Sequence, residues 1–195
     1  MSTINKYEKG LIFENTIKEE LLNNFSDIYI KILNNVVIYD LTNNRITEID
    51  LLLLTTSGIY VIESKNWNGI IYGNPFERIW KQFFNKKVKS KNYYNPIIQN
   101  NEHINFLIKY LGIEKNKFKS YIVFPNKTNI KYLKTASINN PYIKVLKVED
   151  LIFEITKDLK NDEILLSHEE IDKIYIKLKD FDVNQVISEI KNSNN

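Results

Sequence analysis

The sequence contains no cysteine, a single methionine, five glycines and four prolines in 195 residues. Without cysteine the chain has no disulfide, no cysteine-based zinc site and no thiol nucleophile, and it suits a reducing compartment. Any bound metal must therefore be held by oxygen or imidazole ligands.

Long apolar runs are also missing. No stretch reaches the roughly 18 uninterrupted apolar residues that a membrane-spanning helix requires. The opening segment MSTINKYEKG lacks the apolar core of a signal peptide, so we expect a cytoplasmic protein that does not enter a membrane. Because 43% of the residues are hydrophobic, the chain should bury the core of one globular domain, or of one domain with a small appendage.

Positive and negative charges are unevenly distributed along the chain. Residues 1–148 contain 21 Lys and Arg against 12 Asp and Glu, whereas residues 149–195 contain 6 against 12. The formal net charge of +3 thus divides into +9 and −6. The longer part is basic, which favours contact with an acidic partner such as nucleic acid.

Within the basic part, residues 78–94 contain no acidic residue and interleave cations with aromatic rings. Cations for phosphates and rings for base or sugar faces are the components of a nucleic-acid groove. The alternative is a solvated, lysine-rich hairpin whose aromatic residues face the core. The candidate nucleic-acid-binding residues are Arg78, Lys81, Lys86, Lys87, Lys89 and Lys91.

The segment EIDLLLLTTSGIYVIESKNW, residues 48–67, predicts two apolar strands that each carry charge near one end. If Ser57 and Gly58 form a two-residue turn, Asp50 faces Lys65 across the ladder and Glu63 lies diagonally from Asp50. Side chains alternate along a strand, so the three charges emerge on one face, within the ~5 to 8 Å that separates cross-strand neighbours.

Two carboxylates at that separation repel each other unless a positive charge lies between them. Asp50 and Glu63, together with the backbone carbonyl of Ser64, offer the hard oxygen ligands that suit Mg²⁺ or Mn²⁺. Lys65 would orient the attacking water or offset charge on a phosphate as its bond breaks. The alternative is an edge-strand ion pair between Asp50 and Lys65 beside an exposed Glu63.

Helices are predicted before and after these strands in the sequence. Residues 7–25 show a helical stripe with Glu14 in its middle, and Asn95 with Pro96 begins a helix that ends near Gly112. Gln99 lies on the side of this second helix opposite its apolar stripe. Residues 28–33 and 36–39 read as a strand or a hairpin before the charged strands.

The remainder of the chain predicts strands over residues 118–124 and 143–148 and two acidic helices, near 149–159 and 167–182. These acidic helices are a candidate surface for a homodimer or a protein partner. A regulatory role, in which they shield the basic groove, is a further alternative.

The ordered motifs resemble the PD-(D/E)xK nuclease superfamily, and more specifically the nuclease-related domain (NERD) family. The resemblance is carried by GLIFE at 10–14, the segment 48–73, Trp80, and NPIIQNNEHINFL at 95–107. It implies an α/β fold with an αβββαβ core, a central mixed sheet flanked by helices, and additional C-terminal helices. The nuclease core would span residues 1–125, with residues 126–195 packed on it or appended to it.

The resemblance also implies a divalent-metal nuclease in which Asp50 and Glu63 hold Mg²⁺ or Mn²⁺ and Lys65 is catalytic. Glu14 and Gln99 match the acidic and polar residues that the family carries on its two helices. The expected substrate is DNA rather than RNA. The alternative is a nucleic-acid-binding or partner-binding module with little or no turnover.

Two further residues lie near this predicted site. Glu48 shares the strand face of Asp50, and His103 lies one helical turn after Gln99. Glu48 is a candidate to support the ligands or to bind a second metal ion, and His103 is a candidate to contact the site. A surface ion pair for Glu48 and a hydrogen-bonded structural role for His103 are the alternatives.

Overall fold

The computed structural model describes residues 5–40, 45–84, 90–135, 138, 140–161 and 163–180. Within these ranges one helix, six strands, a second helix, three strands and two final helices follow one another along the chain, which makes it a mixed α/β protein. They are α1 (Lys6–Asn24), β1 (Lys31–Asp40), β2 (Arg45–Thr55), β3 (Gly58–Ser64), β4 (Ile70–Gly73), β5 (Ile79–Phe83), β6 (Lys91–Tyr94), α2 (Pro96–Leu111), a 3-10 turn (Lys115–Lys117), β7 (Phe118–Phe124), β8 (Asn129–Leu133), β9 (Ile143–Lys147), α3 (Val148–Asn161) and α4 (His168–Lys179).

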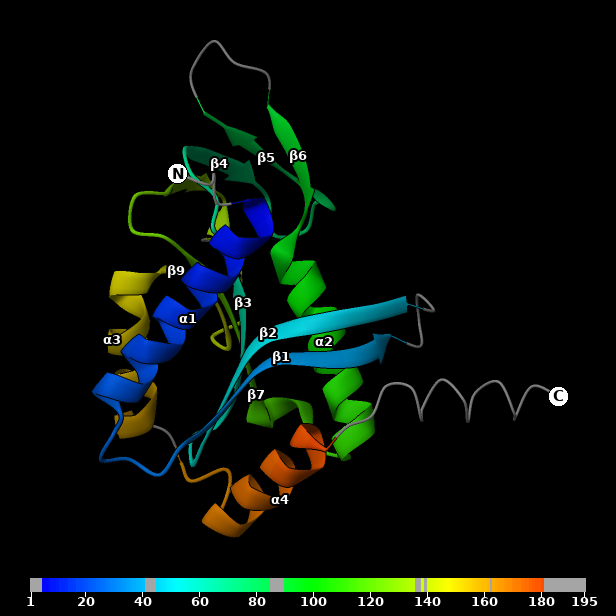
Figure 1. Cartoon of the computed structure of the whole chain (residues 1–195), viewed down its shortest axis with the longest axis vertical. Helices are drawn as coiled ribbons and strands as arrows, with labels where there is room; N and C mark the ends of the chain where they lie inside the picture. Colours follow the sequence, from blue (N-terminus) through cyan, green and yellow to red (C-terminus); the bar gives the residue numbers. More distant parts are fainter. Residues whose placement is uncertain are drawn as a thin grey trace, which may run out of the picture.

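The central sheet has five strands in the order β1-β2-β3-β7-β9 (Figure 1). Strands β1 to β3 are antiparallel, whereas β3, β7 and β9 are parallel. The sheet is therefore mixed, and α2 provides the crossover that a parallel β3–β7 pair requires. The predicted αβββαβ core with flanking helices is confirmed.

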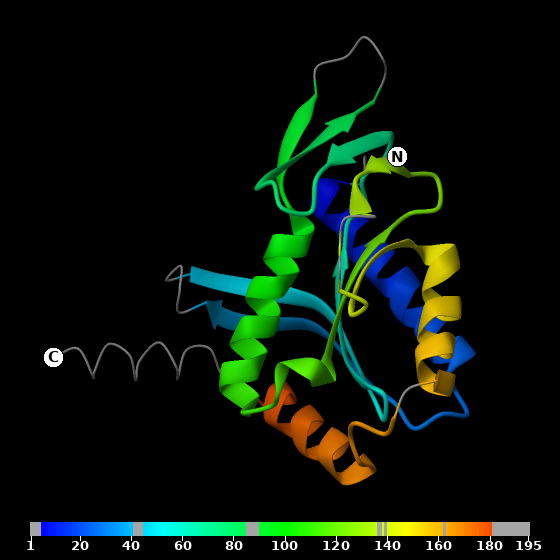
Figure 2. The same ribbon diagram turned by 180° about the vertical axis from the view of Figure 1, so that it is seen from behind.

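Helices cover both faces of this sheet, with α1 and α3 on one side and α2 on the other (Figure 2). Ile17 and Leu21 of α1 pack with Leu151 of α3 and apolar residues of β2, β3 and β7. On the opposite face, Ile104 of α2 and Ile171 of α4 share a second core cluster. The apolar run in β2 thus serves two cores, because its alternate side chains point to opposite faces.

A second sheet, in the order β6-β5-β4-β8, lies beyond the N-terminal end of α2 (Figure 1). Its inner side packs Ile71, Trp80 and Leu133 against Trp67 and Phe124. The sequence left the basic window as part of a nucleic-acid groove or as a lysine-rich hairpin, and β5 and β6 do form an antiparallel hairpin. Strand β4 joins this hairpin to β8, and the parallel pairing of β4 with β8 was not predicted.

The turn between β2 and β3 corrects the predicted register. Thr55 pairs with Gly58, so the turn residues are Thr56 and Ser57 rather than Ser57 and Gly58. The buried Thr55 hydroxyl accepts a hydrogen bond from Ser57 N–H, at 3.1 Å, and this bond closes the turn one residue early. The register therefore shifts by two, an even number, which leaves every side chain on its predicted face.

The first strand takes one of the two forms that the sequence left open, a single strand rather than a hairpin. Residues that read as two short runs form one strand, β1, which pairs along its length with β2. Asn35 has φ of 56° in the middle of this strand. Asparagine tolerates this left-handed conformation, so the strand continues through it.

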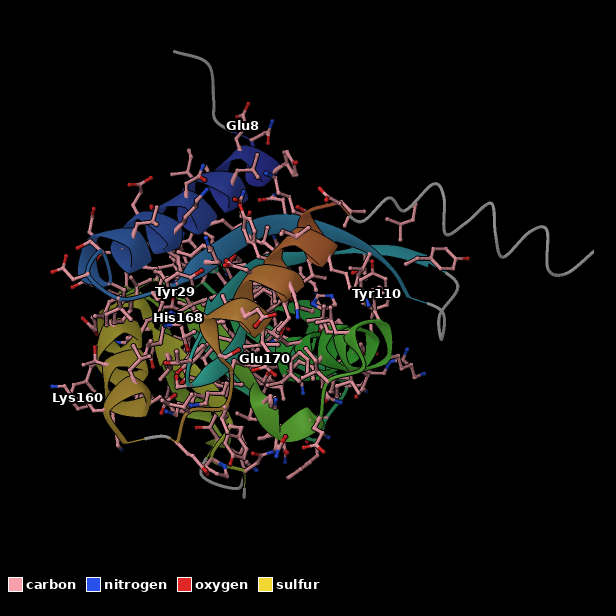
Figure 3. All side chains as sticks on the ribbon, turned by 90° about the horizontal axis from the view of Figure 1, so that it is seen from below. Glu8, Tyr29, Tyr110, Lys160, His168 and Glu170 are labelled. Carbon is pink, nitrogen blue, oxygen red and sulfur yellow. The ribbon has the colours of Figure 1, made fainter. Side chains whose placement is uncertain are left out.

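The C-terminal helices are built into the core. Helix α4 begins beside β1, where His168 stacks on Tyr29 with ring centroids 3.9 Å apart (Figure 3). Tyr29 also donates a 2.7 Å hydrogen bond to Asp172. Ile171, Ile174 and Leu178 are buried in the same core cluster as α2.

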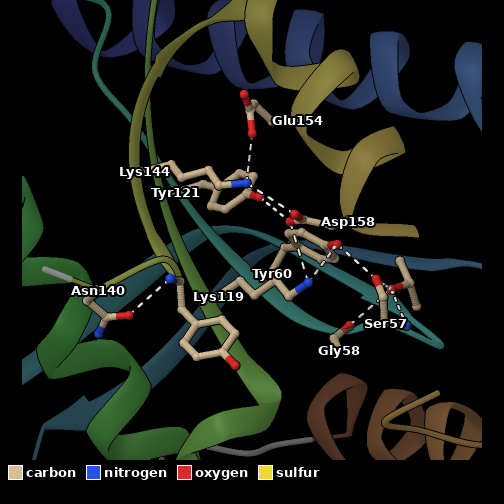
Figure 4. A network of polar contacts seen from close by, with 11 residues as sticks. Ser57, Gly58, Tyr60, Lys119, Tyr121, Asn140, Lys144, Glu154 and Asp158 are labelled. Atoms are coloured by element: carbon tan, nitrogen blue, oxygen red, sulfur yellow. Dashed lines mark hydrogen bonds and ion pairs between the residues drawn. The ribbon is translucent and has the colours of Figure 1, made fainter. Parts of the chain in front are cut away.

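Polar contacts join α3 to the sheet (Figure 4). Asp158 accepts a hydrogen bond from Tyr121, and its carboxylate lies 3.4 Å from the buried Lys119 and 3.1 Å from Lys144. Glu154 pairs with Lys144 at 2.8 Å.

No helix in the described part of the chain has the length and apolarity to cross a bilayer.

Candidate active site

The corrected register brings the charged residues together at one end of the β2–β3 pair. The last paired residues are Leu51 and Ile62, and one further step puts Asp50 opposite Glu63. Glu63 is also paired with Ile122 of the parallel strand β7. The candidate carboxylates thus lie on the most restrained strands of the central sheet, which favours a fixed geometry.

The Asp50 carboxylate is oriented by the backbone of β3. Ser64 N–H donates a 2.7 Å hydrogen bond to Asp50 Oδ2. Burial and the nearby Glu63 raise the pKa of Asp50 to about 7, against the opposing effects of Lys65 and the Ser64 hydrogen bond. An isolated carboxylate here would be costly to ionise, so the position favours a bound cation.

Glu63 is only 1% exposed. Its Oε1 accepts a hydrogen bond from Lys65 Nζ, while its Oε2 has no hydrogen-bond partner among the described residues. Burial raises the pKa of Glu63 although Lys65 opposes the shift. Burial disfavours charge on Lys65 as well, but Glu63 and Asp50 outweigh that effect and raise its pKa. Lys65 is therefore a cation held within an acidic cluster.

His103 approaches Glu63 from α2. It is buried, with Nδ1 3.5 Å from Glu63 Oε2 and Nε2 3.2 Å from Thr47 Oγ1. The Thr47 contact was not anticipated, since nothing in the sequence links a strand threonine to a helix 56 residues away. The histidine is thus placed to fix the orientation of the Glu63 carboxylate.

Glu14 faces the same cluster from α1. Burial first, and then the charges of Asp50 and Glu48, raise the pKa of Glu14 to about 7. Helix α1 is held against the site by Asn66, whose side chain donates a 2.6 Å hydrogen bond to the Lys9 carbonyl. The ammonium group of Lys65 therefore interacts with three carboxylates, and Glu63, Asp50 and Glu14 all raise its pKa.

A pocket of about 340 Å³ opens beside Lys65. Helix α1, the end of β3, β6 and the start of α2 all contribute to it. Its lining residues are Gly10, Ser64, Lys65, Asn66, Trp67, Tyr93, Tyr94 and Gln99. Gln99 thus lies where the sequence placed it, whereas Tyr93 and Tyr94 were assigned to the basic window and not to the site.

The basic window is only partly described. Arg78, Lys81 and Lys91 are exposed around β5 and β6. Arg78 lies 5.8 Å from the ring centroid of Tyr94, a pocket residue. The other three predicted cations, Lys86, Lys87 and Lys89, fall outside the described residues.

The oxygen atoms of the cluster suit a hard divalent cation. Within the described ranges, no three His, Asp or Glu side chains form a complete metal-ligand group. Two carboxylates with a backbone carbonyl and water suffice for Mg²⁺, which commonly takes one or two protein carboxylates. The buried Glu63 Oε2 makes no hydrogen bond within the described residues and lies 3.5 Å from His103 Nδ1, so it can serve as a ligand atom. The donor set of Asp50, Glu63 and the Ser64 carbonyl therefore fits Mg²⁺ or Mn²⁺.

Comparisons with known proteins found two similar proteins, neither of known function. An uncharacterized protein of Bacillus anthracis is 29% identical over 134 residues, which are 68% of this chain and 61% of that protein. The chain thus spans about 61% of the length of this relative. A crystal structure of AF1548, a protein of unknown function, has 15% sequence identity and a TM-score of 0.37 over 87% of this chain and 96% of that chain.

A family comparison is more specific. The model of the nuclease-related domain (NERD) matches residues 9–125, which is more than half of the chain. The match includes most of α1, strands β1 to β6, α2 and all of β7. The chain therefore belongs to the nuclease-related domain family.

Proposed function

We propose that the protein is a divalent-metal-dependent nuclease that hydrolyses phosphodiester bonds in DNA. The observation that carries the proposal is the environment of Glu63. This carboxylate is 1% exposed, has one oxygen without a hydrogen-bond partner in the described residues, and adjoins both Asp50 and Lys65. A carboxylate this deeply buried, whose Oε2 makes no hydrogen bond in the described residues and lies 3.5 Å from His103 Nδ1, is costly in a purely structural role.

Asp50, Glu63 and the Ser64 backbone carbonyl would hold Mg²⁺ or Mn²⁺. When bound, the ion supplies positive charge at the phosphate and lowers the pKa of a coordinated water. The Ser64 N–H bond keeps Asp50 oriented toward β3, and His103 limits the movement of Glu63. Fixed ligands of this kind need little rearrangement before the reaction.

Lys65 is the group best placed to act on the reacting phosphate. It lines the pocket, and its ammonium is retained by Glu63 and Asp50. There it would orient the attacking water or offset the negative charge that develops on phosphate oxygens. Gln99 lines the same pocket with an amide able to hold a water or a phosphate oxygen. Glu14 would position a water on the α1 side of the cluster.

Nucleic acid is the partner that the surrounding charge favours. Arg78, Lys81 and Lys91 are exposed on the hairpin next to the pocket, and phosphate contacts by such cations supply much of the affinity for DNA. The preference for DNA over RNA comes from the family resemblance and is tested by supplying both substrates.

The decisive experiment incubates the purified chain with linear, circular, single-stranded and branched DNA, and with RNA, in Mg²⁺, Mn²⁺ or EDTA. We expect cleavage with a divalent ion only, and its loss in Glu63→Gln and Lys65→Ala. Glu19→Gln, an exposed carboxylate on α1, is the matched control that should cut like the parent. Equal cleavage by Glu63→Gln and the parent would refute the proposal.

A second candidate is a nucleic-acid-binding module that does not turn over. It is favoured by the exposed cations Arg78, Lys81 and Lys91 beside the pocket, which can hold phosphates without a metal ion. Salt-sensitive DNA binding without cleavage in any divalent ion would support this function over the first.

A further inference from the structure

The second sheet has an outer face that none of the three described core clusters covers. Residues alternate between its two sides, so the face opposite Trp80 carries Ile79, Lys81 and Phe83 of β5. Register extends this face across the sheet, since Tyr132 of β8 pairs with Tyr72 of β4, which in turn pairs with Lys81.

Aromatic rings dominate this outer face. Tyr72 and Tyr132 are stacked, with centroids 4.7 Å apart and ring planes at 15°. Phe83 makes an edge contact with Tyr72 at 5.1 Å. The two tyrosines are 39% and 42% exposed, and neither belongs to a core cluster of the described residues. The stack covers one face of each ring and leaves 39% of Tyr72 and 42% of Tyr132 exposed to a binding partner.

Charge around these rings has one sign. The four strands of this sheet contain Lys81, Lys91 and Lys131 and no Asp or Glu. Lys81 is exposed beside Tyr72 in the register, and Lys131 Nζ lies 4.9 Å from the ring centroid of Tyr132. The face therefore offers rings and cations in alternation to a polyanion.

The same face is continuous with the candidate active site. Two residues along β5 from Lys81, and on the same face, Ile79 pairs with Tyr94, which lines the pocket that contains Lys65 and Gln99. A chain lying across Tyr132, Tyr72 and Lys81 would thus reach the pocket at Tyr94.

We propose that the outer face of the β4-β5-β6-β8 sheet is a binding platform for single-stranded nucleic acid, with bases stacked on Tyr72 and Tyr132 and phosphates held by Lys81 and Lys131. This inference rests on the proposed function and names its substrate class. Base faces are available for stacking only where strands are unpaired, whereas a duplex presents phosphates. A sheet face with exposed rings therefore discriminates in favour of single strands.

The test measures binding in EDTA, so that it does not depend on cleavage. The probes are a fluorescent single-stranded 20-mer DNA, the same sequence as a blunt duplex, and an abasic 20-mer of equal charge. The parent should bind the single strand more tightly than the other two probes. Tyr72→Ala and Tyr132→Ala should each weaken single-strand binding by roughly 5- to 150-fold, the loss of one stacked base, without changing affinity for the abasic strand.

Matched variants separate stacking from folding and from charge. Tyr72→Phe and Tyr132→Phe should bind like the parent, because stacking does not need the hydroxyl. Tyr142→Ala removes an equally exposed tyrosine, 42%, outside this sheet and should have no effect. Lys81→Ala and Lys131→Ala should each reduce the salt slope of log affinity by about 0.7.

Parental affinity in either tyrosine-to-alanine variant, or equal binding of single strand, duplex and abasic strand, would overturn the platform. So would a change of oligomeric state in these variants without loss of binding, which would make the face a protein interface. If the platform variants behave as expected but no substrate is cut in divalent ions, the binding face stands and the nuclease assignment fails.

Discussion

Ser64 N–H donates a 2.7 Å hydrogen bond to Asp50 Oδ2, so the residue between Glu63 and Lys65 orients the carboxylate of the neighbouring strand. The donor is a backbone group, and it survives any change of the Ser64 side chain. Asp50→Asn preserves an acceptor for this bond while removing the charge. This pair of residues therefore allows metal affinity to be separated from local folding.

The first prediction concerns metal binding without catalysis. Mg²⁺ or Mn²⁺ at a hundredfold excess over its Kd should stabilise the parent by about 2.7 kcal/mol, a rise of roughly 5–10 °C in Tm. Asp50→Asn and Glu63→Gln should lose this shift because each removes a charged ligand. The measurement is thermal unfolding with and without the ion, and Glu19→Gln should respond like the parent. A full shift in both ligand variants would argue against the site.

The second prediction concerns the pH dependence of the metal-free protein. Glu14 has a pKa of about 7 in the folded chain, above its ordinary value, so the folded state binds this proton more tightly than the unfolded state. Its contribution to stability is complete at low pH and is lost as the pH rises to 7. Glu14→Gln, which stays neutral, should therefore exceed the parent in stability above pH 7 and approach it near pH 4.5.

Thermal unfolding in EDTA across pH 4.5–8.5 checks this sign. A stability difference that does not change with pH would mean that Glu14 is not desolvated by its surroundings. Addition of a divalent ion at pH 8 should reduce the advantage of Glu14→Gln, because positive charge in the cluster favours the ionised carboxylate.

The third prediction compares two glycines. Gly58 has φ of 125°, and a Cβ there would lie 2.7 Å from the Lys117 carbonyl oxygen, so Gly58→Ala should cost about 1–3 kcal/mol or more. Gly10 lies within α1, and its Cβ would meet nothing nearer than Glu14 Oε1 at 3.8 Å. Gly10→Ala should therefore stabilise the helix, by up to about 1 kcal/mol. Urea unfolding of both variants tests the pair, and equal effects would contradict it.

Residue patterns predicted the strands of the central sheet and the common face of Asp50, Glu63 and Lys65, whereas the assembly of those strands into a mixed sheet was implied by the family resemblance. Apolar runs and period-2 alternation specify strands and faces, and an error of two residues in the register does not change a face. The error itself came from the Thr55 hydroxyl, which closes the turn before Gly58. Such a local side-chain contact is not encoded in the hydrophobic pattern.

Long-range pairing was beyond prediction. The partnership of β4 with β8 joins segments separated by more than 50 residues, and no periodicity specifies it. Consequently the aromatic residues of the basic window could not be sorted between core and surface. In the structure Trp80 of this window is buried, and its Tyr93 and Tyr94 line the pocket. Tyr72 and Tyr132, outside the window, are the exposed rings of the same sheet.

The last prediction tests the polar network that joins α3 to the sheet. Lys119 has a side chain only 3% exposed, and Asp158 Oδ2 lies 3.4 Å from its ammonium. Asp158→Asn keeps the shape but removes the charge that faces this buried lysine, which should cost about 3–5 kcal/mol. Glu154→Gln, which affects the more exposed pair with Lys144, should cost less than about 1 kcal/mol.

The pH dependence of this network gives a second check. Burial disfavours the charge of Asp158, but the Tyr121 hydrogen bond and the ammonium groups of Lys119 and Lys144 outweigh it and lower its pKa. An acid with a lowered folded pKa contributes stability above its unfolded pKa, about 3.9, and loses it as the pH falls through the folded value. The gap in unfolding free energy between parent and Asp158→Asn should therefore be largest near pH 7 and shrink below pH 4. A gap that stays constant down to pH 2.5 would show that Asp158 acts through packing and not through its charge.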